Sequence, residues 1–143
     1  MSDFVSWRNS YSIGIRVIDD QHKYLLNLTN HLYEACTFND GLIGEKFKTT
    51  IQSAIEYVGV HFSTEEKLME RTNYPGIAAH KQAHKIFVQK VLESVKEFEE
   101  GKVYTPNAFV RFLRDWVLEH IAMEDKKMGE YFLRLKQQGK LHS

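Results

Sequence analysis

The sequence predicts an all-α protein, an up-down-up-down four-helix bundle preceded by an N-terminal arm. Three observations lead to this prediction. Apolar residues recur every three or four positions along four long stretches, which is the spacing of one helix face. Only 2 prolines occur in 143 residues, so long helices can run uninterrupted. Turn-forming residues separate the stretches, and none of the stretches alternates as a strand does.

The arm is expected at residues 1–16, which carry several aromatic residues and Gly14 but no sustained helical spacing. A first helix is expected at about 17–37. Asp19 and Asp20 stand near its start, where the helix dipole favours carboxylates.

A second helix is expected at about 42–71 and a third at about 77–99, because Asn, Pro and Gly interrupt the pattern at 73–76. A fourth helix is expected at about 105–136. Pro106 suits its first turn, where the missing N–H needs no partner. The four helices follow one another with short breaks, which predicts antiparallel neighbours within a single domain spanning 1–143.

Composition excludes several classes of function. Nineteen Lys and Arg balance nineteen Asp and Glu, which argues against a sequence-blind nucleic-acid binder. No apolar run is long enough for a transmembrane helix, and no signal peptide is visible, so we expect no membrane insertion. The lone Cys36 cannot form an internal disulfide, which favours a cytoplasmic location.

Seven histidines are the most informative residues. His61 is followed four positions later by Glu65, and His80 is followed at the same spacing by His84. Residues four apart project from one helix face, so each pair can bind one metal ion. Each predicted helix carries at least one histidine of the set His22, His61, His80, His84 and His120.

A single helical histidine is more often a surface or hydrogen-bonded core residue than a ligand. Here His61 and His120 lie on the apolar stripes of their helices, where an imidazole costs free energy unless it finds a partner. One metal site would satisfy several of them together. Imidazole with carboxylate suits iron, manganese or zinc.

The carboxylate that accompanies His120 is ambiguous. Glu124 follows it by four positions and Asp125 by five. On an ideal helix Glu124 lies about 40° from His120, whereas Asp125 points about 140° away. Periodicity alone therefore favours Glu124.

Further motifs surround the histidines: Trp7 and Gly14-Ile15 in the arm, Asp19-Asp20-Gln21-His22, His61 through Glu66, Tyr74-Pro75, His80-Lys81-Gln82-Ala83-His84, and Trp116 through Asp125. With these motifs the sequence resembles the hemerythrin family, in particular single-domain bacteriohemerythrins, over nearly the whole chain. The resemblance implies two iron ions bridged by an oxo or hydroxo group.

The resemblance also implies a role for each residue. His80, His84 and His120 would bind one iron, His22 and His61 the other, and Glu65 and Asp125 would bridge both. It thus selects Asp125 over Glu124, and we expect a local π-type distortion of the fourth helix there. Six ligands would surround the first iron and five the second, leaving one open position.

Dioxygen binds at that position in the family, so the resemblance implies reversible oxygen storage, transport or delivery to an oxygen-consuming enzyme. No enzyme activity is expected beyond a side peroxidase reaction. Two alternatives remain: a di-iron peroxide or nitric oxide reductase, and an oxygen or iron sensor acting through a partner. We expect a monomer or weak oligomer.

The family alignment implies an oxygen pocket lined by Leu25, Phe62, Trp116 and Val117, although all four also suit an ordinary core. Val117 stands where the family usually has leucine. His31 and His142 match no ligand position and are expected in solvent. The segment 37–45 has no assigned role.

Overall fold

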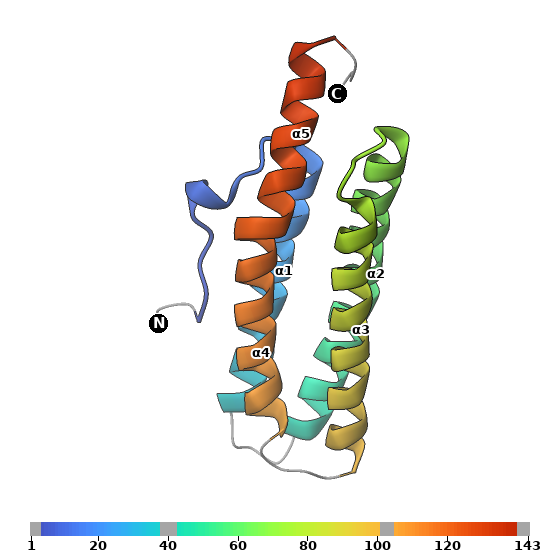
Figure 1. Cartoon of the computed structure of the whole chain (residues 1–143). Helices are drawn as coiled ribbons and strands as arrows, with labels where there is room; N and C mark the ends of the chain where they lie inside the picture. Colours follow the sequence, from blue (N-terminus) through green and yellow to red (C-terminus); the bar gives the residue numbers. More distant parts are fainter. Residues whose placement is uncertain (1–3, 38–42, 101–104, 140–143) are drawn as a thin grey trace.

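The computed structural model describes residues 4–37, 43–100 and 105–139, and it confirms the all-α four-helix bundle (Figure 1). The helices are α1 (Arg16–Thr37), α2 (Ile43–Arg71), α3 (Ile77–Glu99) and α4 (Thr105–Glu119). A π-helical segment, η2 (His120–Asp125), joins α4 to α5 (Lys126–Gln137), and the three form one continuous column. The described residues contain no strand, and none of their helices is long and apolar enough to cross a membrane.

The arm is ordered by contacts with α1. It contains a short 3-10 turn, η1 (Asn9–Tyr11). The Asn30 side chain accepts a hydrogen bond from the Val5 N–H at 2.9 Å and donates one to the Val5 carbonyl at 2.8 Å. The Asp19 carboxylate accepts the Ile13 N–H at 2.9 Å and the Ser12 hydroxyl. Asp19 therefore ties the arm to the first turn of α1, which begins three residues earlier at Arg16.

The helices pack as a ring in which α1 contacts α2 and α4, and α3 contacts the same two helices. The buried apolar residues fall into two clusters. The larger includes Leu25, Phe62, Phe87, Val117 and Ile121. The smaller comprises Ile13, Ile18, Met69, Met128 and Phe132.

Along each helix, buried polar residues stand between the two clusters. On α1, His22 falls between Ile18 and Leu25; on α2, Glu65 falls between Phe62 and Met69. The apolar core is thus divided by one polar layer. That layer is the candidate site.

Candidate metal centre

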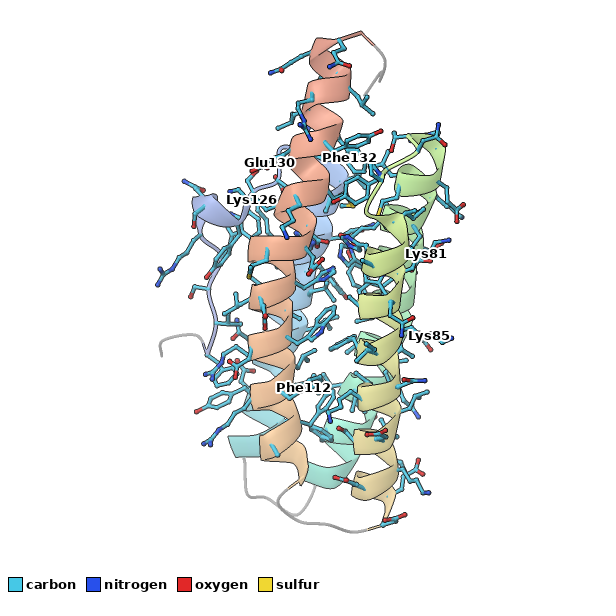
Figure 2. All side chains as sticks on the ribbon, viewed as in Figure 1. Lys81, Lys85, Phe112, Lys126, Glu130 and Phe132 are labelled. Atoms are coloured by element: carbon cyan, nitrogen blue, oxygen red, sulfur yellow. The ribbon has the colours of Figure 1, made fainter. Side chains whose placement is uncertain are left out.

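Seven buried side chains form the polar layer. They come from α1, α2, α3 and η2, and each is at most 4% exposed: His22, His61, Glu65, His80, His84, His120 and Asp125. The helical spacing turns the intervening residues outward. Lys81 and Lys85 adjoin His80 and His84 in sequence, yet their side chains point away from the bundle (Figure 2).

Three histidines gather on one side of the layer, which we call the three-histidine side. Glu65 Oε1 lies 3.3 Å from His80 Nε2, 3.1 Å from His84 Nε2 and 3.5 Å from His120 Nε2. Asp125 Oδ1 lies 3.0 Å from His80 Nε2 and 2.9 Å from His120 Nε2. Three imidazoles and two carboxylate oxygens therefore surround one point.

Two histidines gather on the other side, the two-histidine side. Glu65 Oε2 lies 3.1 Å from His61 Nε2 and 3.5 Å from His22 Nε2, and Asp125 Oδ2 lies 2.7 Å from His22 Nε2. Each carboxylate thus turns one oxygen to each side. This is the arrangement of carboxylates that bridge two metal ions.

The π-helical segment explains how Asp125 reaches the site. Hydrogen bonds in a π-helix join residues five apart, so the residue five positions after His120, which is Asp125, is brought toward the same face. Asp125 is fully buried beside His120, whereas Glu124 is only half-buried and forms no hydrogen bond or ion pair with the five site histidines in the described structure. The distortion expected from the resemblance is present, and the residue favoured by ideal periodicity is not the one that the backbone brings in.

The unpaired atoms of the layer fit bound cations better than a hydrogen-bond network. Within the described residues, His22 Nε2, His61 Nε2, Glu65 Oε2 and both Asp125 oxygens are buried without a hydrogen-bond partner, despite the short separations above. Neighbouring ligands of one ion with bonds of about 2.1 Å lie about 3.0 Å apart at right angles. The observed separations of 2.7 to 3.5 Å match that spacing.

Among the described residues, two groups satisfy the distance requirement for a shared ion: Glu65 with His80, His84 and His120, and Glu65 and Asp125 with His22 and His61. Imidazole and carboxylate, with no thiolate among them, are donors that iron accepts. The residues present therefore fit a pair of metal ions.

The electrostatics of the layer also call for positive charge. Burial alone would lower the pKa of His120, but the adjacent Asp125 and Glu65 raise it to about 10. The same competition raises the pKa of His22 and of His80 to about 9. Burial and Glu65 act to raise the pKa of Asp125, yet the histidines hold it at about 2. The surrounding histidines likewise hold the pKa of Glu65 well below its usual range, although burial acts to raise it. Both carboxylates are thus kept ionised, and cations or protonated imidazoles must neutralise them.

Two further side chains orient site histidines, and their roles could not be assigned from the sequence. Gln21 Oε1 accepts a hydrogen bond from His61 Nδ1 at 2.7 Å, and Glu66 Oε2 lies 2.8 Å from His84 Nδ1. Each is a sequence neighbour of a site residue, which is the only signal that could have found it. Such partners fix the tautomer and ring orientation of metal-binding imidazoles.

Aromatic rings cover the three-histidine side. Phe62 stacks on His84 with ring centroids 3.7 Å apart, and Trp116 stacks on His120 at 4.5 Å. The Phe62 ring is also 5.9 Å from the His61 ring, so it spans both sides. A cavity of about 140 Å³ lined by Trp116 and His120 opens beside this wall.

The other two residues expected at the oxygen pocket are aliphatic and lie in the apolar core. Leu25 and Val117 belong to the larger apolar cluster together with Phe62, and both are buried. His31 is exposed, and His142 and residues 38–42 lie outside the described residues.

Bundle and site together define a metal-binding helical protein, and comparison with known proteins gives its family. The chain belongs to the hemerythrin family: the family model described as Hemerythrin HHE cation binding domain matches residues 13–132. A bacteriohemerythrin of Stenotrophomonas maltophilia is 35% identical over 125 residues, which is 87% of this chain and 78% of that protein. A bacteriohemerythrin of Methylococcus capsulatus is 33% identical over 120 residues, which is 83% of this chain and 88% of that protein.

Solved structures show the same fold. The crystal structure of a wild-type hemerythrin superposes with a TM-score of 0.81 at 28% identity, covering 89% of this chain and 96% of that chain. The match confirms the predicted resemblance and the four-helix bundle.

Proposed function

We propose that this protein binds dioxygen reversibly at a pair of iron ions bridged by an oxo or hydroxo group. The observation that carries the proposal is the unequal division of histidines between two sides that share the same two carboxylates. Names of similar proteins support it, since curated relatives are bacteriohemerythrins.

Counting donor atoms turns this inequality into a binding site. The three-histidine side offers five protein atoms, one each from His80, His84, His120, Glu65 and Asp125. The two-histidine side offers four, one each from His22, His61, Glu65 and Asp125. A bridging oxygen raises these counts to six and five, so an octahedral ion on the two-histidine side keeps one position for a small ligand. When bound, the two ferrous ions supply the electrons that hold dioxygen.

The protein's own contribution is to position the donors and exclude water. The buried ring of Phe62 lies against His61 and His84 and, together with His84, lines the hollow between α2 and α3, where it limits the access of water to the site. Following the family resemblance, we assign Leu25, Phe62, Trp116 and Val117 to the lining of the dioxygen pocket. Phe62 contacts His61 on the two-histidine side, whereas Trp116 lies against His120 on the other side. An apolar lining slows the entry of water and protons, which favours release of the ligand over its reduction.

Storage or delivery in the cytoplasm to an oxygen-consuming enzyme is the role we propose, with binding rather than turnover as the activity. The test is an optical titration of protein loaded anaerobically with Fe(II). We expect an absorption band on exposure to air that disappears under argon and returns on a second exposure. A band that never returns after one cycle, with peroxide or nitric oxide consumed in stopped-flow mixing, would support a reductase instead.

Matched histidine variants test where the metal is held. His80→Ala should lose iron and the optical band, because it removes a donor that faces both carboxylates. His31→Ala, at an exposed position on α1, should keep both. Equal behaviour of the two variants would show that the band does not arise from this centre.

A further inference from the structure

A groove of about 660 Å³ lies beyond the metal centre, where the first turn of α1, the last turns of α2 and helix α5 meet. It belongs to the end of the bundle at which α5 continues past the other helices (Figure 1). The three segments that line it, at 14–17, 64–71 and 132–136, are far apart in sequence. Its volume is within the range of small-molecule sites.

The described residues at the rim of the groove carry only one sign of charge. Four of them are cationic, Arg16, Lys67, Arg71 and Lys136, and none of the described lining residues is acidic. Arg16 has a loose ion pair with Asp20 at 3.9 Å. Lys67, Arg71 and Lys136 form no ion pair within the described part of the chain. These cations are therefore available to an anion.

The walls between these cations are apolar. Leu68 and the buried Phe132 lie at the inner end, and Phe132 points inward from α5 (Figure 2). Val17 and Leu133 line the outer part and are 51% and 38% exposed. Exposed apolar area is unfavourable in water, and the cations beside it attract an anion. A ligand with an apolar body and an anionic end would therefore complement both features.

Gly14 shapes the edge of the groove. It adopts φ +83°, and a Cβ atom there would come within 3.1 Å of Leu133 Cδ1. A glycine therefore lets the arm turn into α1 close to α5 while leaving the groove between them open.

We propose that this groove binds a long-chain acyl carboxylate, with the acyl chain against Leu68, Phe132 and Leu133 and the carboxylate between Lys67 and Arg71. The walls come from three chain segments, at 14–17, 64–71 and 132–136, and enclose a concave space, which suits one acyl chain. A flat or protruding surface would suit a bilayer. Lys67 and Arg71 are four residues apart on α2, so both can reach one carboxylate.

The groove is connected to the metal centre by hydrogen bonds. Thr64 lines the groove, and its hydroxyl accepts a hydrogen bond from Gln21 Nε2 at 3.2 Å. Gln21 in turn accepts the hydrogen bond from His61 at 2.7 Å. A ligand in the groove would thus lie against Thr64, which is the last residue of the hydrogen-bond series that runs from His61 through Gln21.

The test is isothermal titration of the full-length, iron-loaded protein with dodecanoate below its micelle concentration. We expect one equivalent to bind, with decanoate about tenfold weaker because two methylenes are lost. Acetate and dodecyltrimethylammonium should not bind. Lys67→Ala/Arg71→Ala should weaken dodecanoate at least tenfold, whereas the exposed pair Arg111→Ala/Lys127→Ala, outside the groove, should leave it unchanged.

A dodecanoate bearing a terminal diazirine gives an independent readout. Irradiation should label peptides containing Leu68 or Leu133, and excess dodecanoate should suppress the label. The proposal is overturned by the absence of saturable heat, by equal binding of dodecyltrimethylammonium, or by an unchanged affinity in Lys67→Ala/Arg71→Ala. Binding to anionic phospholipid vesicles without binding of free dodecanoate would likewise overturn it, in favour of a membrane-docking surface.

Discussion

Helices α2 and α3 present the same spacing to the metal centre with different chemistry. On α2 the pair is His61 and Glu65, and on α3 it is His80 and His84, each four residues apart. Because Glu65 replaces a second histidine on α2, its two oxygens reach both sides of the layer. One residue type at one helical position thus creates both one of the two carboxylate bridges and the shortage of histidine donors on the two-histidine side.

The groups behind the histidines differ in the same way. His84 is held by the carboxylate of Glu66, whereas His61 is held by the neutral amide of Gln21. A carboxylate partner increases the donor strength of an imidazole more than an amide does. The three-histidine side therefore also has the histidine with the stronger supporting partner. On the two-histidine side, which is proposed to take dioxygen, the supporting partner is weaker.

The largest effect is expected from removing the second bridge. Asp125→Ala takes one donor from each side and leaves buried histidines without their counter-charge, so iron content should fall from two per chain to one or none. Glu124→Ala, one position away and half-buried, should retain both irons. Metal analysis after gel filtration checks this, and greater loss in Glu124→Ala would mean that ideal helical periodicity is the better guide.

A large effect of pH is expected on the chelator-treated, metal-free protein. The folded-state pKa values of His22, His80 and His120 are about 9, 9 and 10, above the 6.5 of an unfolded histidine. Their stabilising contribution is complete below pH 6.5 and is lost as the pH rises through 9 to 10. Asp125 acts oppositely, since its pKa of about 2 lies below 3.8, and its contribution is lost as the pH falls through 2.

We therefore expect the melting temperature of the metal-free protein to decline from pH 6.5 to pH 10, and that of the iron-loaded protein to vary less. Thermal unfolding followed by circular dichroism measures both. His31→Ala serves as a control, because its exposed imidazole should leave the profile unchanged. A metal-free protein that gains stability between pH 7 and 10 would show that the histidines are not paired with the carboxylates.

A moderate effect is expected when the supporting groups are removed. Glu66→Ala should weaken metal retention about 10- to 100-fold, the usual range for such partners, and Gln21→Ala should weaken it less. Competition with a chelator followed by absorbance gives the two affinities. Lys85→Ala, an outward-pointing neighbour of His84, is the control (Figure 2). The opposite ranking of Glu66 and Gln21 would remove the proposed difference between the two sides.

The smallest effect on stability is expected at Val117, which is 2% exposed in the larger apolar cluster. Val117→Leu adds one methylene, worth about 0.8 kcal/mol if it fits, while overpacking costs about 1–3 kcal/mol. A fuller pocket should slow the decay of the oxygenated absorption band, and Val117→Phe should slow oxygen entry. Stopped-flow traces indistinguishable among wild type and both variants would place Val117 in the ordinary core.

The bundle could be predicted from the sequence because its signals are local. Apolar spacing and the residues at 73–76 bring the expected third helix to the observed bounds, Ile77–Glu99. The first helix, expected at about 17–37, also matches Arg16–Thr37 to one residue, but the role of Asp19 was less predictable, because its carboxylate accepts hydrogen bonds from the arm. Which groups the Asp19 carboxylate binds depends on where the arm lies in three dimensions.

The site was predictable only in part from residue spacing. The pairs His61–Glu65 and His80–His84 follow from ideal helix geometry, but Asp125 does not, since a π-helical turn depends on tertiary contacts that periodicity ignores. The family resemblance supplied that residue. Contacts such as Gln21 with His61 join different helices, and their side-chain conformations leave no trace in the spacing.

The most direct test of the unequal centre is anomalous diffraction at the iron edge from a crystal of the iron-loaded protein. Two peaks are predicted per chain, one among His80, His84 and His120 and the other between His22 and His61, with Glu65 and Asp125 touching both. A single peak, or a second ion bound by Glu124 in place of Asp125, would contradict the two-sided centre from which the proposed oxygen binding follows.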